Sequence, residues 1–227
     1  MDSSLHIIIG FFVLIAIASI SGCTLPPEIL HKVPHVCQAP TGNWDDPRHQ
    51  DGCEEACILM MANTVQGIQD MDPEAANNEI QEMCVIEEGR FGSYIDTGLE
   101  DTTTLLHAFF ESKNIHCPAT KYVKGGAVTV QGMKEDLAQG YVLLFPINAQ
   151  KGLMHPNYRS MPLVHMVLVV GYRGDACIIN DPGTVHGTEM DDFSCEDLLF
   201  KNGDYISGEG QNNEGDTREK AYMAVKL

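Results

Sequence analysis

The sequence predicts a single α+β domain in which helices come first and an antiparallel sheet follows. The first half of the chain holds helix-like segments, and the second half holds apolar, β-branched runs bounded by Gly, Pro and Asn. Elements segregated in this way favour an α+β domain over a doubly wound sheet. With 227 residues and 44% hydrophobic composition, the chain can bury one sizeable core rather than two.

The strongest helical signal covers residues 53–66, which are apolar on nearly every side. That pattern is typical of a helix buried at the centre of a domain. Two further helices are expected over 72–83 and 101–114, because Asp72 and Asp101 stand where an N-cap is needed, the first of them directly before a proline.

The pattern changes after residue 130. Residues 130–140 form a short amphipathic segment that predicts a helix. The runs 141–147, 163–172 and 176–181 are strongly apolar and predict buried strands, and 221–227 predicts a last strand. The central helix over 53–66 should therefore pack on a C-terminal antiparallel sheet.

Charge argues against one class of partner. The formal net charge is −18, with only 14 Lys and Arg residues, and no basic cluster reverses that sign locally. Because a phosphate backbone would be repelled, we expect no nucleic-acid partner.

The N-terminus has the character of an export signal. Residues 7–20 are an uncharged apolar run that suits a signal-peptide core. The run ends at Ile20-Ser21-Gly22-Cys23, which resembles a bacterial lipobox, and this resemblance implies lipidation of Cys23. We expect a signal peptide over 1–22, a tether over 23–32 and the folded domain over 33–227, outside the cytoplasm and anchored to a membrane. Residues 1–6 contain no Lys or Arg, so an uncleaved membrane anchor is a second interpretation.

Eight cysteines are present. If Cys23 is lipidated and Cys53 is a free nucleophile, six remain, which permits up to three disulfides in fifteen possible pairings, among which the sequence does not choose. Paired C-x-x-C spacings are absent, so we expect no zinc site, metal or cofactor.

Four residues match the parts of a thiol-dependent acyl transfer site. Cys53 follows Gly52 at a predicted helix start, where the macrodipole and unpaired N–H groups favour a thiolate nucleophile. His165 is the candidate base, and Asp181 the group that fixes its tautomer. Gln38 and the backbone N–H of Cys53 would stabilise the oxyanion. A short turn between the strands of His165 and Asp181 can bring the two side by side.

Three motifs resemble those of one family: VPHVCQ with a following Trp, DGCEEACILMM, and HMVLVVGY with INDPG. They are similar to the papain-like cysteine peptidases related to bacteriocin-leader (double-glycine) peptidases, in their stand-alone secreted form, over roughly residues 33 to 183. The resemblance implies a papain-like fold, a peptide or protein substrate, and the roles already given to Cys53, His165, Asp181 and Gln38. The stretch between Gln38 and Cys53 is longer than in the leader peptidases themselves.

Each assignment has a plainer alternative. Cys53 could be a small buried hydrophobe, and Asp181 could serve only its turn, with Asn180 as the orienting group instead. The charges of Glu54 and Glu55 oppose a thiolate unless they point away or are paired. For the whole chain, we expect a cysteine peptidase. The alternatives are an acyl or amide transferase of the same fold and a non-catalytic surface binding module.

Overall fold

The computed structural model describes residues 24–148, 164–185, 193–204 and 219–227. In chain order the elements are β1 (Glu28–Leu30), α1 (Pro47–Gln50), α2 (Cys53–Gln66), α3 (Pro73–Phe91), α4 (Leu99–Ser112), β2 (Thr120–Lys124), the 3₁₀ turn η1 (Gly125–Ala127), α5 (Val130–Ala138), β3 (Tyr141–Asn148), β4 (Val164–Arg173), β5 (Ala176–Asn180), β6 (Phe193–Ser194), α6 (Cys195–Lys201) and β7 (Ala221–Lys226). The predicted α+β class is confirmed.

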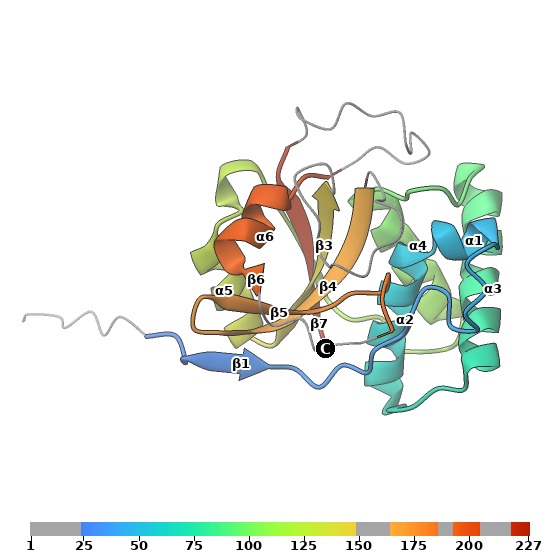
Figure 1. The fold of residues 1–227 in the computed structure, drawn as a ribbon, viewed down its shortest axis with the longest axis horizontal. Coiled ribbons are helices and arrows are strands. Elements are labelled where there is room, and N and C mark those ends of the chain that lie inside the picture. Colours follow the sequence, from blue (N-terminus) through green and yellow to red (C-terminus); the bar gives the residue numbers. More distant parts are fainter. Residues whose placement is uncertain (1–23, 149–163, 186–192, 205–218) are drawn as a thin grey trace, which may run out of the picture.

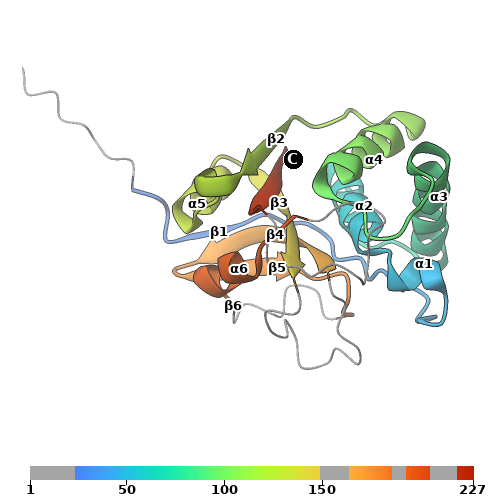
Figure 2. The same cartoon turned by 90° about the horizontal axis from the view of Figure 1, so that it is seen from above.

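A single sheet divides the molecule into layers. Its strands pair antiparallel in the order β2-β7-β3-β4-β5-β6, and β1 pairs with the far end of β4. Helices α1 to α4 lie on one side of the sheet, whereas α5 and α6 lie on the other (Figures 1 and 2). The sheet is thus buried on both faces, which explains why its central strands are apolar at nearly every position rather than at alternate ones.

Helix α2 has the bounds that the sequence predicts and lies at the centre of the helical layer. It is buried from Cys53 to Asn63, and it packs between β4 on one side and α3 and α4 on the other. Gly67 ends the helix in the left-handed conformation, with φ of 72°. A helix covered on all sides needs apolar residues on all sides, so the observed sequence pattern and the observed packing agree.

The other predicted helices and strands are present, with shifted ends. Asp72 caps α3 by accepting hydrogen bonds from two backbone N–H groups, as expected. Helix α4 instead begins at Leu99 after Gly98, so Asp101 lies in its first turn and is not its cap. The sequence patterns did not predict α1, β1, β2, β6 or α6.

Strand β1 lies inside the segment interpreted as a tether. Its residues pair with the end of β4, Glu28 opposite Arg173, and the hydroxyl of Tyr172 donates to the carbonyl of Pro26. A side chain at Gly171 would place its Cβ 2.2 Å from the carbonyl oxygen of Ile29, so this close approach requires glycine. The folded part of the chain therefore begins before Val33.

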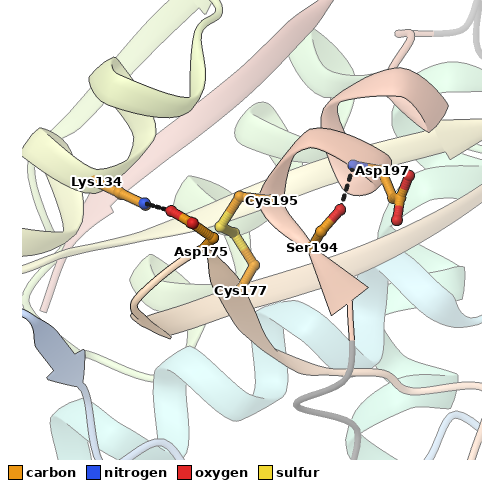
Figure 3. The surroundings of a disulfide bond; sticks show 6 residues. All are labelled: Lys134, Asp175, Cys177, Ser194, Cys195 and Asp197. Carbon is orange, nitrogen blue, oxygen red and sulfur yellow. Dashed lines mark hydrogen bonds and ion pairs between the residues drawn. A yellow bond between two sulfur atoms is a disulfide. The ribbon is translucent and has the colours of Figure 1, made fainter.

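One disulfide joins the described half-cystines, between Cys177 on β5 and Cys195 at the start of α6, with Cα atoms 5.0 Å apart. Figure 3 shows the bond beside the Lys134–Asp175 ion pair and the Ser194 cap of α6. The two cysteines are 18 positions apart in the sequence. The bond therefore ties helix α6 to the strand of the sheet that it covers. The free cysteines among the described residues are 37, 53, 57, 84 and 117.

Several sequence expectations lie outside the described residues. These are the signal peptide over 1–22, the lipobox and Cys23. Within the ranges that the structure describes, no helix combines the length and the apolar character needed to cross a bilayer.

Candidate active site

Cys53 is the first residue of α2, as the sequence predicts. The preceding residue, Gly52, provides no side-chain cap for the helix. A Cβ on Gly52 would lie 2.7 Å from the carbonyl oxygen of Arg48 in α1, so the chain can enter α2 by this route only with glycine. The close approach of α1 to the start of α2 therefore fixes where Cys53 stands.

The sulfur of Cys53 is held by two neighbours. Its Sγ donates to Oε2 of Glu54 at 2.9 Å, and it accepts from the backbone N–H of Met166 at 3.4 Å. Met166 follows His165 on β4, so the sulfur lies against the backbone of the strand that carries the candidate base. The sulfur is also buried, with 3% of the residue exposed.

These surroundings oppose ionisation of the thiol. Burial raises the pKa of Cys53 well above its ordinary value, and the carboxylate of Glu54 raises it further. The N–H of Met166 acts in the opposite direction and does not outweigh them. The expectation that the helix start favours a thiolate is therefore wrong for the resting arrangement, because the opposing charge of Glu54 points at the sulfur.

His165 and Asp181 form a buried pair. Nε2 of His165 lies 2.8 Å from Oδ1 of Asp181, and both residues are at most 2% exposed. An ionised carboxylate can only accept, so Nε2 carries the hydrogen and Nδ1 is the nitrogen able to take a proton. Asp181 also accepts from the backbone N–H of Gly183 at 2.9 Å. The structure thus brings together two residues that are 16 positions apart, as the strand pairing predicts.

Asn180, the rival for the orienting role, is engaged elsewhere. Its Nδ2 donates to the carbonyl of Val33 at 3.1 Å. The ring of His35 donates to the backbone carbonyl of Asp181 at 2.9 Å, and the N–H of Gln38 donates to the carbonyl of Pro182 at 2.8 Å. The segment from Val33 to Gln38 therefore lies along the loop of Asp181 and contributes to holding it.

Gln38 is buried, with 4% of the residue exposed. Its Nε2 donates to the carbonyls of His49 and Gln50, at 2.8 and 3.0 Å. Both amide hydrogens are thus directed at the end of α1, immediately before the turn into Cys53. These contacts give Gln38 a structural role in positioning that turn.

Glu55 lies in a second buried cluster, on the α3 side of α2. Its Oε1 accepts from Sγ of Cys84 at 3.1 Å, and Thr97 donates to Oε1 of Glu87 at 2.6 Å. Among the described residues, these three groups, Glu55, Cys84 and Glu87, have ligand atoms close enough to hold a metal ion. Oε2 of Glu55 and Oε2 of Glu87 are buried without a hydrogen-bond partner among the described residues. Burial raises the pKa of both carboxyl groups, so a proton accounts for the cluster as well as a metal ion does. We therefore assign no metal ligands here.

Sequence reasoning missed three contacts of the site. Glu54 was recognised as a charge near the thiol, but its burial was not foreseen, because a first-turn glutamate ordinarily faces solvent. The N–H of Met166 has no side-chain signal to read. His35 lies within the VPHVCQ motif, and this position in the same motif as Gln38 is the sequence feature that could have marked it as part of the site.

Comparison with known proteins identifies a family and finds related solved structures. A model of the Peptidase_C39 like family matches residues 30–205, which is most of the chain. A crystal structure from Bacillus anthracis, assigned as a C39-like peptidase, is similar to this chain with 13% sequence identity and a TM-score of 0.47. That alignment covers 88% of this chain and 98% of the other. No curated protein matches the sequence.

Proposed function

The chain belongs to the Peptidase_C39 like family, and from that premise we propose that it is a cysteine peptidase whose nucleophile is Cys53. The family agrees with the resemblance in the VPHVCQ, DGCEEAC and INDPG motifs. One observation carries the proposal. His165 on β4 is hydrogen-bonded to Asp181, and the next residue of the same strand, Met166, contacts the sulfur of Cys53 through its backbone N–H.

In the proposed reaction, Nδ1 of His165 takes the thiol proton of Cys53, and the thiolate attacks the peptide carbonyl. The imidazolium is stabilised by Asp181 and returns its proton to the departing amine, which leaves a thioester on Cys53. Water, deprotonated by the same imidazole, then attacks the thioester and releases the acid and the free thiol.

Stabilisation of the oxyanion falls to donors at the start of α2. The first N–H groups of a helix have no partner within the helix, so the backbone N–H of Cys53 is suitably oriented for this role. We propose Gln38 as the second donor. Its amide must then release one of the two carbonyls of α1 that it contacts in this structure.

The test of the function is digestion of a mixed peptide library, read by mass spectrometry, with the wild type, Cys53→Ser and His165→Ala. We expect new peptide termini with the wild type and none above background with either variant. Adding amine acceptors separates hydrolysis from acyl transfer, because a transferase would produce amide-linked products. Cleavage that survives in Cys53→Ser would overturn the proposal.

We also propose that Cys23 carries a lipid that anchors the domain to a membrane. The support is the resemblance of Ile20-Ser21-Gly22-Cys23 to a lipobox after an apolar run. Cys23→Ala should release the protein from the membrane fraction of an expressing bacterium. Unchanged membrane retention with an unprocessed N-terminus would favour an uncleaved anchor instead.

A further inference from the structure

Glu54 occupies an unusual place for a carboxylate in the first turn of a helix. Such residues generally face solvent, where they complement the macrodipole. Glu54 is instead fully buried, and its Oε2 accepts the thiol hydrogen of Cys53 at 2.9 Å. Burying a carboxylate is costly unless it is hydrogen-bonded. Thiol and carboxylate therefore form one buried unit at the start of α2.

The charge of the Glu54 carboxylate affects whether the Cys53 sulfur is a thiol or a thiolate. A thiolate on Cys53 would stand at hydrogen-bond distance from the Glu54 carboxylate, and two adjacent anions in a buried site repel strongly. The same carboxylate also opposes ionisation of Cys57, one turn further along α2. While Glu54 is ionised, the sulfur is consequently best accommodated as a neutral thiol.

The other ionisable groups around the unit come from three directions. His165 stands on β4, one residue before Met166, whose backbone N–H contacts the sulfur. Asp181, beyond β5, is paired with that imidazole, and Asp96, in the loop before α4, acts on Cys53 with the same sign as Glu54. On α2 itself Glu55 follows Glu54. Among the described residues named here, His165 is the group that can take up a proton from the thiol, and the others are carboxyl groups that oppose a thiolate.

We propose that Glu54 is a positioning residue that holds Cys53 in a resting thiol form, and that the reactive Cys53–His165 ion pair forms when the Glu54 carboxylate is protonated or displaced. In that step the thiol proton passes to Nδ1 of His165, and no other bond is made or broken. The proposal rests on the proposed function, since it concerns the nucleophile of the same site. It makes Cys53 a restrained nucleophile, released by acid or by a substrate that moves Glu54.

The experiment is alkylation of Cys53 by iodoacetamide from about pH 5 to about pH 10, followed on the Cys53 peptide by mass spectrometry. Glu54→Gln keeps the shape of the side chain and removes its charge. We expect the rate constant at neutral pH to rise at least about tenfold, the equivalent of one pKa unit. Glu74→Gln, in the exposed first turn of α3, is the matched control for loss of one negative charge and should behave as the wild type. A Glu54→Gln rate at or below that of the wild type overturns the proposal.

A second measurement remains informative if Glu54→Gln does not fold. The ultraviolet thiolate absorbance of the wild type, with that of Cys53→Ser subtracted, should show no Cys53 thiolate at neutral pH in the resting protein. A thiolate already present there overturns the restraint without any Glu54 variant. Peptide cleavage is scored separately: cleavage that depends on Cys53, with unchanged alkylation in Glu54→Gln, refutes the role of Glu54 while the peptidase stands. Faster alkylation without cleavage supports the restraint and refutes the peptidase.

Discussion

Two buried thiol–carboxylate pairs lie at the same end of α2, and consecutive residues provide their carboxylates. Cys53 donates to Glu54 on the side of the sheet, whereas Cys84 of α3 donates to Glu55 on the side of the helices. Both sulfurs have a raised pKa, mainly through burial, and that of Cys84 rises to about 12. The two pairs share burial and a thiol–carboxyl hydrogen bond, but Glu54 raises the pKa of Cys53, whereas the hydrogen bond with Glu55 lowers that of Cys84.

The surroundings of the two sulfurs differ. The Cys53 sulfur accepts from the backbone of β4, next to the His165–Asp181 pair. The Cys84 pair instead adjoins Glu87, a third carboxyl group. Burial and a neighbouring carboxyl group are common to both thiols, so neither feature separates a nucleophile from a structural cysteine. An imidazole with a fixed tautomer is what distinguishes the first pair from the second.

The largest expected effect comes from exchanging sulfur for oxygen in each pair. Cys53→Ser should lower kcat/KM for peptide cleavage by roughly 10⁴-fold or more, as loss of a nucleophile does in other hydrolases. Cys84→Ser should leave cleavage unchanged, because a serine hydroxyl can still donate to Glu55. Steady-state kinetics on one cleaved peptide checks both. Equal losses in the two variants would mean that the pairs are not functionally distinct.

A smaller effect is expected from the group that orients the imidazole. Asp181→Ala should lower kcat/KM by roughly 10²-fold, because the hydrogen bond to Nε2 of His165 and the stabilisation of the imidazolium are both lost. Asn180→Ala is the matched control. It removes the hydrogen bond to Val33 and should cost about 1 kcal/mol of unfolding free energy with little change in kcat/KM. If Asn180→Ala were the more damaging to kcat/KM, the orienting role would belong to the amide.

Local patterns predicted the parts of the fold and site that depend on neighbouring residues. The bounds of α2, the Asp72 cap of α3 and the central strands follow from periodicity and capping. The His165–Asp181 contact follows from two strands joined by a short turn. Each of these features needs only residues close in sequence, or strands adjacent in the chain.

The features that the sequence did not reveal depend on distant pairing. Strand β1 has three residues and exists because β4 provides an edge more than 140 positions away. The sequence does not distinguish the Cys177–Cys195 bond among the fifteen possible pairings, because the bond depends on how α6 packs against β5. Glu54 resembles any solvated first-turn glutamate until the sheet covers that face of α2. The burial of Glu54 and its hydrogen bond with the Cys53 thiol both depend on tertiary packing.

The last expected effect concerns stability alone and tests the second cluster, formed by Glu55, Cys84 and Glu87. Burial raises the pKa of Glu87 from 4.5 to about 7. The folded protein therefore keeps a proton that the unfolded chain gives up between these two pH values, so the unfolding free energy should fall as pH rises through that window. A change from 4.5 to about 7 corresponds to on the order of 3 kcal/mol.

Glu87→Gln should flatten this pH dependence, because the amide is neutral throughout the window and can donate to Glu55. Urea unfolding at about pH 5 and about pH 8 measures the difference between wild type and variant, in which the contributions of ionisable groups remote from this cluster cancel, so that the difference reports on Glu87 and its neighbour Glu55. Glu88→Gln, one position later and exposed, is the control and should keep the wild-type slope. Since this cluster is separate from the sulfur of Cys53, kcat/KM in Glu87→Gln should stay at the wild-type value. A loss of cleavage without a loss of stability would show that the two thiol–carboxylate pairs communicate through α2.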